Sequence, residues 1–212
     1  MRLVLVTPPA AEPLTATEAK SRLGIGAEVS DDVMDAFVKT ARQTIDGWGG
    51  WLGRALIRQS WKIILDCFPH DCDGAIVIPL PPIISVDEIK YLDLAGNSKT
   101  IEPSAYFLLP GEPAQLYPAV GTAWPHVNRR PGAVEITFTA GFGEAGTDLP
   151  EPIRNAVALM VSNLRSLTAR NLFISSDTVE GVGSKSYVVG GNAGDAIDAA
   201  VSWLLSTYRV FA

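Results

Sequence analysis

In one short stretch of the chain, four neighbouring side chains are of types that bind metal ions or carry out redox chemistry. Cys67, His70, Asp71 and Cys72 lie within six positions of one another. A tetrahedral zinc site needs four ligands, usually in two separated pairs, and the sequence offers no second cluster. The spacing of the two cysteines also differs from the Cys-x-x-Cys of thiol redox catalysts. The stretch is therefore predicted to be a turn between two strands, without a metal.

Other patterns that could support catalysis are incomplete. In 181–186 a serine separates the second glycine from the lysine, and no helix is predicted to follow, so the P-loop pattern is absent. The spacing in 141–146 matches Gly-x-Gly-x-x-Gly, but the preceding strand belongs to an antiparallel module and not to a βαβ unit. His70 and His126, which alone could activate a nucleophile as imidazole bases, lie in predicted turns or loops. We expect no catalytic residue, no metal and no cofactor.

The composition is that of an ordinary folded protein, with 212 residues of which 47% are hydrophobic. The 17 Lys and Arg against 23 Asp and Glu give a formal net charge of −6, the wrong sign for binding nucleic acid by neutralising phosphates. A sequence-specific DNA-binding protein is therefore not expected. The apolar run in 1–7 is too short for a secretory signal, and no apolar segment approaches the ~20 residues of a membrane span. We expect no association with a membrane.

The first part of the chain, residues 1–54, is predicted to be helical after an extended proline-rich lead. Thr15 or Thr17 is suited to cap a short helix, which Gly24 would end. Ser30 is placed to cap a second helix. The apolar residues of this second helix recur at helical spacing, namely Val33, Phe37, Val38, Ala41, Ile45 and Trp48.

The middle of the chain, residues 55–148, is predicted to be a small antiparallel β module. Apolar residues there follow a period of two, and turn residues recur every eight to twelve positions. The expected strands are 61–65, 75–80, 84–92, 106–109, 115–117 and 134–139.

Helices are predicted again in the last part of the chain. Pro150 and Pro152 suit the first turn of a core helix in 149–174. The glycine- and serine-rich residues 175–194 are typical of a mobile connection, with at most one short strand at 187–189. A final assembly helix is expected within 195–212.

The final helix is apolar around most of its circumference. One stripe comprises Ile197, Ala200, Val201, Leu204 and Tyr208, whereas Ala196, Ala199, Trp203 and Leu205 fall outside it. A helix that is apolar all round belongs in a core or between subunits, so either a buried terminal helix or a partner surface is possible. The predicted interface residues are Trp203, Leu204, Leu205, Tyr208, Arg209 and Phe211.

Taken together, these elements predict an α+β fold. We expect an α-helical connector domain of about four helices with an inserted small antiparallel β module, because the chain leaves the helical layer once and returns once. The predicted segments are 1–54, 55–148, 149–174, 175–194 and 195–212.

Several stretches, spread in order over nearly the whole chain, are also similar to those of one known family. Five of them are short motifs: Thr-Pro-Pro at 7–9, Gly-Arg-Ala-Leu-Ile at 53–57, Gln-Ser-Trp at 59–61, Pro-Leu-Pro-Pro-Ile at 79–83 and Tyr-Arg at 208–209. The others are the stretches 13–20, 130–134, 138–143 and 149–154. With these the sequence resembles the tailed-phage head-tail connector (adaptor) family, which is also present in prophages and gene transfer agents.

The resemblance implies a structural protein of the virion and not an enzyme. Family members assemble as a ring beneath the portal protein, extend the DNA channel and offer a platform to a tail-completion or stopper protein. The implied partners are the portal protein and neighbouring copies, while DNA passes without sequence-specific binding. The implied location is the head-tail junction, after assembly in the host bacterial cytoplasm. A net charge of −6 agrees with a channel wall past which DNA slides.

Two other classes of function stay open on the sequence. One is a generic protein-interaction module of bacterial origin, which would also use an apolar terminal helix. The other is a small metal-dependent enzyme built on the β module around Cys67 and Cys72.

Overall fold

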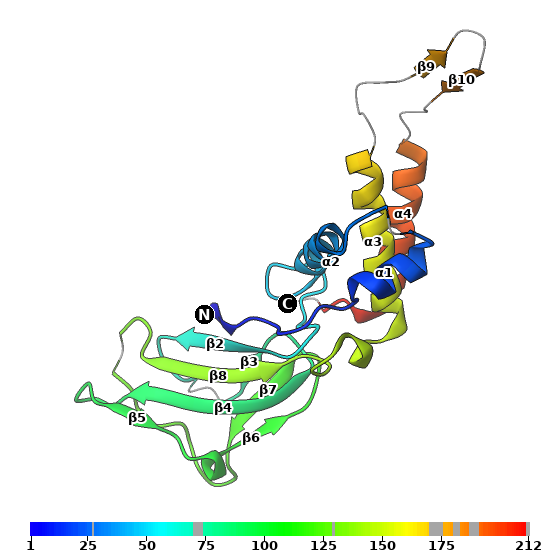
Figure 1. The fold of residues 1–212 in the computed structure, drawn as a ribbon. Helices are drawn as coiled ribbons and strands as arrows, with labels where there is room; N and C mark the ends of the chain where they lie inside the picture. Colours follow the sequence, from blue (N-terminus) through cyan, green and yellow to red (C-terminus); the bar gives the residue numbers. More distant parts are fainter. Residues whose placement is uncertain are drawn as a thin grey trace. The chain divides into compact units, whose positions relative to one another are not determined.

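The structure is a computed structural model that describes residues 1–26, 28–69, 74–128, 130–169, 176–179, 183–186 and 191–210. The chain forms two compact units (Figure 1). Unit 1 contains Met1–Glu12, Thr44–Leu149 and the chain end from Arg209. Unit 2 contains Pro13–Gln43 and Pro150–Tyr208.

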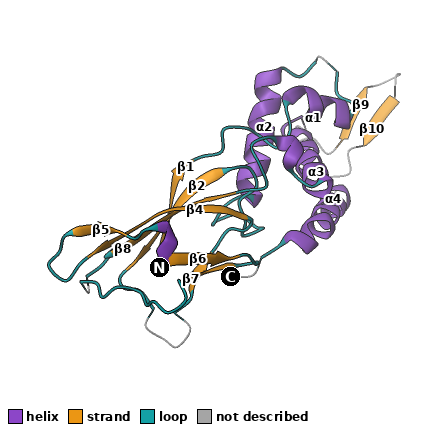
Figure 2. Cartoon of the chain, turned by 90° about the horizontal axis from the view of Figure 1, so that it is seen from below, coloured by secondary structure: helices purple, strands orange, loops and turns teal. Residues whose placement is uncertain are grey.

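Unit 1 is built on two antiparallel sheets, which Figures 1 and 2 show as separate layers. The five-stranded sheet has the order β1-β2-β8-β4-β5 and the smaller sheet the order β3-β7-β6. The strands of the first are β1 (Arg2–Thr7), β2 (Gln59–Leu65), β8 (Val134–Ala140), β4 (Ile83–Leu92) and β5 (Ser98–Thr100). Those of the second are β3 (Ile76–Ile78), β7 (Ala114–Pro118) and β6 (Tyr106–Leu109), and two 3-10 turns, η1 (Pro103–Ala105) and η2 (Gly146–Asp148), complete the unit.

The alternation of apolar residues sets which face of the large sheet is buried. Ile63 on β2 lies opposite Ile136 on β8, which in turn lies opposite Ile89 on β4. All three side chains are fully buried, as expected because residues directly opposite each other on neighbouring strands share one face of the sheet. On the other face, Lys62 and Glu135 form an ion pair with an N–O distance of 2.8 Å.

Aromatic side chains fill the core of unit 1. Phe138 of β8 and Phe68 are fully buried, and the Phe68 ring stacks on Trp124 with 5.0 Å between centroids. The Trp124 indole N–H donates to the Gly74 carbonyl at 2.5 Å. Burial of a side chain such as phenylalanine contributes about 1.5–3 kcal/mol, so these residues add to the apolar stabilisation that the buried isoleucines of unit 1 provide.

Two sets of buried polar contacts, one around Asp46 and one around Arg54, fix the loop 46–58 that precedes β2. The Asp46 carboxylate accepts hydrogen bonds from the Leu56 N–H at 2.9 Å and from the Gln59 amide at 2.8 Å. Arg54, only 2% exposed, donates two bonds to Glu112 at 2.9 and 2.5 Å. Buried polar groups are tolerated when they have such partners, and these bonds hold the loop against the sheets.

Unit 2 is helical. It contains α1 (Ala16–Leu23), α3 (Glu151–Ala169), α4 (Gly191–Leu205), the 3-10 turn η3 (Ser206–Tyr208) and most of α2 (Asp31–Ile45). α3 packs against α4 and against α1 (Figure 2). A two-stranded hairpin, β9 (Ser176–Val179) and β10 (Gly183–Ser186), also belongs to this unit. None of the helices among the described residues is long and apolar enough to cross a membrane.

Local signals start and stop these helices as the sequence predicts. Thr15, rather than Thr17, caps α1 in a capping box with Glu18, and Gly24 ends it with a left-handed φ of 61°. The Ser30 hydroxyl accepts from the Val33 N–H at 3.4 Å at the start of α2.

Several predictions need correction. Residues 2–7 form β1, whereas the sequence predicts no strand before residue 55. β5 forms in the turn region after β4, and α4 begins at Gly191 instead of 195. Two strands, β9 and β10, form in the connection 175–194, where the sequence predicts at most one. The expected strand at 187–189 lies outside the described residues, as do His70, Asp71, Cys72 and Phe211.

The stripe expected on the second helix is also only partly buried. Val38, Ala41 and Ile45 are buried, but Val33 and Trp48 are nearly half exposed. The helix ends at Ile45, so Trp48 follows it in the turn. The mixed α+β class is confirmed by the helices and the antiparallel sheets.

Candidate assembly surface

The outward face of α4 is the first candidate for an assembly surface. On its inward side Ile197, Val201 and Leu204 are half-buried, at positions spaced to pack on α3. Ala196 and Ala199 are exposed on the other side, together with Trp203, whose side chain is 75% exposed. An indole that is exposed to water lacks the large apolar stabilisation that its burial would give. In the single chain, the Trp203 side chain is therefore mostly unburied.

The predicted interface residues do not all lie on this surface. Leu205 is fully buried and Tyr208 is half-buried, so neither offers a side chain to a partner as Trp203 does. Arg209 is exposed and belongs to unit 1, whereas Phe211 lies outside the described residues. Of the predicted set, Trp203 therefore lies on the outward face of α4, whereas Leu204 lies on the inward side and is half-buried.

The chain end is attached to the loop 51–53 within unit 1. The Val210 N–H donates to the Leu52 carbonyl at 2.9 Å, and the Arg209 guanidinium lies 4.6 Å from the centroid of the Trp51 ring. Gly53 has a φ of +64°, and a Cβ there would lie 2.8 Å from the Val210 carbonyl oxygen. A cation over an indole and a close backbone contact together hold these residues in place.

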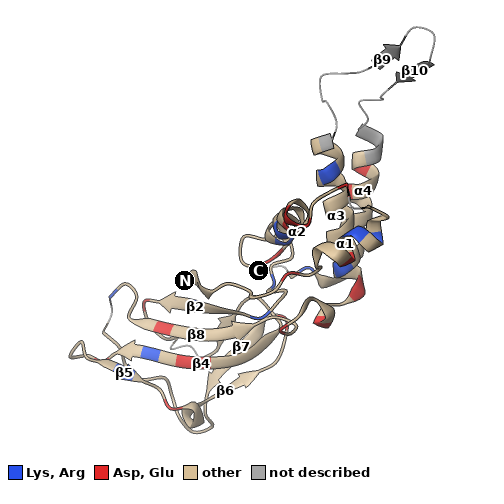
Figure 3. Ribbon diagram, in the orientation of Figure 1, with Lys and Arg blue, Asp and Glu red and all other residues tan. Residues whose placement is uncertain are grey.

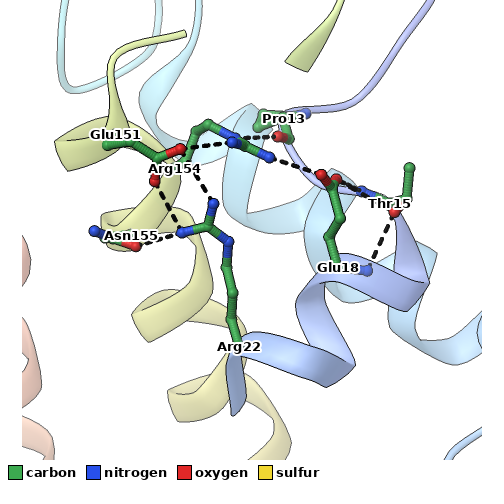
Figure 4. Close-up of polar contacts among 7 residues, drawn as sticks. All are labelled: Pro13, Thr15, Glu18, Arg22, Glu151, Arg154 and Asn155. Carbon is green, nitrogen blue, oxygen red and sulfur yellow. Dashed lines mark hydrogen bonds and ion pairs between the residues drawn. The ribbon is translucent and has the colours of Figure 1, made fainter. Parts of the chain in front are cut away.

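A polar cluster joins α1 to α3 in unit 2 (Figure 4). Arg154, whose side chain is 8% exposed, donates to Glu18 at 2.8 Å and to Glu151 at 2.6 Å. Its Nε–H also donates to the Pro13 carbonyl at 3.4 Å. Every side of the guanidinium thus has an acceptor, which satisfies a buried cation.

Arg22 extends this cluster along α1. It donates to Glu151 at 3.0 Å and to the Asn155 side chain at 2.6 Å. The hydrogen bond from Arg22 is the main reason that the pKa of Glu151 is lowered, and Arg154 adds to it. The bond from the Thr15 N–H, with a smaller contribution from Arg154, lowers the pKa of Glu18. Both carboxylates are therefore held charged, which suits a structural clamp and not proton transfer.

The charges are unevenly spread over the elements. Figure 3 shows acidic and basic residues on α1, α2 and α3, while β6 and β7 carry none. Across the described parts of the chain, no group of three His, Cys, Asp or Glu side chains is placed to hold a metal ion. Cys67 is exposed; the other members of its sequence cluster lie outside the described residues.

Sequence reasoning missed the residues that hold the chain end. Trp51 and Gly53 are more than 150 positions from Arg209, and no local pattern links a tryptophan in a turn to a distant arginine. The one signal was the glycine itself, because a glycine after an apolar residue often marks a left-handed backbone or a close approach.

Comparison with solved structures gives the fold a precedent. A chain in the virion of a native gene transfer agent (GTA) particle matches with a TM-score of 0.69 and 23% identity. A chain in the neck of an empty GTA particle, computed with C6 symmetry, matches at 0.70 and 24%. A chain in the neck of a native GTA particle, computed with C12 symmetry, matches at 0.64 and 21%. Each match covers 100% of this chain and 97% of the other.

These matches show that the protein has the fold of those chains over its whole length. The similarity therefore includes both units. No protein-family model matches the sequence, and no curated protein matches it.

Proposed function

We propose that the protein is a structural head-tail connector (adaptor) subunit at the neck of a phage-like particle. In this role it forms a ring under the portal protein, extends the DNA channel and provides the platform for a tail-completion or stopper protein. It acts without enzymatic activity or a cofactor, in the virion, after assembly in the host bacterial cytoplasm.

The observation that carries this proposal is the match over 100% of the chain to chains of gene transfer agent necks. The match also covers 97% of the neck chain. The C6 and C12 symmetry with which those necks were computed supports a ring.

The exposed face of α4 supports a protein partner. Trp203 is 75% exposed, and tryptophan is among the residues that most often contribute large binding energies at interfaces. The neighbouring charges on α4, Asp195 and Asp198, are acidic and exposed. We assign this face to the portal protein or to a neighbouring copy.

The test is the mass of the purified protein alone and after mixing with the portal protein of the same particle, measured by light scattering. A stoichiometric ring on the portal is expected. Failure to associate with the portal under any condition would overturn the proposed function.

The same measurement on the double variant Trp203→Ala, Leu204→Ala tests the surface. We expect at least a tenfold loss of affinity, as for truncation of an interface anchor. The matched control is Trp48→Ala, which removes an indole that is 46% exposed in unit 1. Ring formation that is unchanged in the double variant would show that α4 is not the docking surface.

A further inference from the structure

The N-terminal strand β1 is an edge strand with little protection. It pairs only with β2, from Arg2 opposite Ile64 to Thr7 opposite Ser60. Leu3 to Thr7 contains no charged residue and no proline. Among the described residues, no backbone hydrogen bond reaches β1 on its open side. Alternate residues of such a strand direct both the N–H and the C=O away from the sheet.

The side chains of β1 are exposed on both faces of the sheet. Val4, Leu5 and Val6 are 41–50% exposed, although successive residues point to opposite faces. Natural proteins usually shorten, charge or cover an edge strand, because a long apolar edge templates pairing with another chain. The protections of β1 are limited to Arg2 at its first position and a register shift between Leu5 and Thr7. The apolar residues between them are therefore open to pairing with another strand in the assembled state.

A second edge of the same kind is present in the smaller sheet. β6 pairs only with β7, and its sequence, Tyr-Phe-Leu-Leu, carries no charge. Phe107 and Leu109 are nearly half exposed. The two remaining edges of unit 1, β3 and β5, have three residues each, and Ser98–Thr100 of β5 are polar and include a lysine.

The two apolar edges lie on different sides of unit 1. In Figure 1 the strand at the N-terminus is at the upper side of unit 1 and β6 is at its lower side. A single chain cannot pair them with each other, but two copies related by a rotation can bring β1 of one against β6 of the next.

We propose that β1 of one copy pairs with β6 of a neighbouring copy, so that the two sheets of unit 1 continue from subunit to subunit. The occupant is a second copy because the necks that contain the matching chains were computed with C6 and C12 symmetry. Each chain also supplies one edge of each kind, and Arg2 is the one charged residue on the two strands. This inference rests on the proposed ring, for which it supplies the contact between neighbours.

Pairing of two different edges is a heterologous contact, and such contacts repeat around a ring. Pairing of β1 with β1 would instead be isologous and would stop at a dimer. The heterologous arrangement leaves neither β1 nor β6 open, whereas the isologous one leaves β6 without a partner.

Cysteine pairs test the contact directly. In a chain with Cys67→Ser and Cys72→Ser, Val4→Cys is combined with Leu109→Cys or with Phe107→Cys. The purified protein is oxidised in two samples, one of which is concentrated alone and the other mixed with the portal protein. A ladder of disulfide-linked trimers and larger species is expected on a non-reducing gel.

Leu5→Cys is the matched control for Val4→Cys. Both side chains are about equally exposed but point to opposite faces, so only one of the two should cross-link with Leu109→Cys. Equal ladders from both would indicate random collision and would overturn the proposal. Dimers from Val4→Cys alone would also overturn it, in favour of β1 pairing with β1.

Charge substitution gives a second measurement that does not depend on register. Val4→Lys with Val6→Lys should lower the self-association constant at least tenfold while leaving the thermal unfolding curve unchanged. Val120→Lys, at a valine that is 97% exposed in unit 1, is the control and should leave association unchanged. Unaltered association of the double variant would contradict the proposal.

The outcomes also separate this inference from the proposed function. A ring on the portal without the ladder refutes the β1–β6 contact and leaves the connector role standing. A ladder in protein that never binds the portal supports the contact and refutes that role. Neither a ring nor a ladder refutes both.

Discussion

The two units of the protein bury different kinds of side chain. The core of unit 1 contains large aromatic residues, among them Phe68, Phe138 and Trp124. In unit 2 no aromatic side chain is buried among the described residues, and the buried set there consists of aliphatic side chains and several alanines. Each unit also holds a buried arginine paired with glutamate, Arg54 with Glu112 in unit 1 and Arg154 with Glu18 and Glu151 in unit 2. In unit 2 this clamp joins two helices, α1 and α3.

The stability of each unit should therefore respond to a different kind of change. Large-to-small changes in a tightly packed aromatic core leave a cavity, and the cost rises with its volume. A clamp of ion pairs depends instead on pH and on each partner being present. The substitutions below test this difference between the two units.

The largest effect is expected for Phe138→Ala in unit 1. The side chain is fully buried between the two sheets, so its truncation should lower the free energy of unfolding by about 3–5 kcal/mol. Urea unfolding followed by circular dichroism measures it. Val120→Ala, at a residue that is 97% exposed in unit 1, is the control and should change stability by less than about 0.5 kcal/mol.

A smaller effect is expected for Arg154→Ala in unit 2. The change removes the bonds to Glu18, Glu151 and the Pro13 carbonyl, which should cost about 2 kcal/mol. Thermal unfolding measures it. Arg165→Ala is the control, because that arginine is 41% exposed and lies 3.6 Å from Glu28, a surface pair of at most about 1 kcal/mol. Equal losses for both arginines would contradict the view that the clamp is special.

Gly53→Ala tests the attachment of the chain end in unit 1. A left-handed φ costs about 1–2 kcal/mol for alanine, and the added Cβ would also press on the Val210 carbonyl oxygen. Hydrogen exchange of the Val210 amide should therefore accelerate. Gly121→Ala is the control, since its φ is +80° but no atom lies within 4 Å. Slow exchange at Val210 in the Gly53 variant would refute the contact.

The smallest effect is a loss of unit 2 stability in acid. Folding lowers the pKa of Glu18 and of Glu151 below the ordinary 4.5. Their stabilisation is therefore fully present above pH 4.5 and is lost as the pH falls through the lowered values. Glu18→Gln keeps a residue that can complete the capping box but cannot ionise. Its unfolding temperature should depend less on pH below 4.5 than that of the parent protein, and an identical pH profile would contradict this role.

The sequence predicted those elements whose signals are local. Thr15 with Glu18 three residues later is enough to start α1, and the alternation in 134–140 is enough for β8. In α3, Ile153, Val157 and Val161 recur at helical spacing and are all fully buried.

The elements that the sequence missed depend on distant partners. β1 is a short apolar run before two prolines, and only its pairing with β2, more than fifty residues away, makes it a strand. The burial of Leu205 likewise depends on its neighbours in space, because it falls outside the periodic stripe of its own helix. The aromatic core of unit 1 gathers residues from Trp61 to Phe138, a set that no single window of sequence contains.

The division of the chain between the units has a consequence for inheritance. The backbone passes from one unit to the other after Glu12, Gln43, Leu149 and Tyr208. Replacing one unit with that of a related gene therefore requires four recombination breakpoints, whereas a single crossover within the gene leaves at least one unit assembled from two parents. A single crossover therefore cannot exchange one intact unit for that of a related gene.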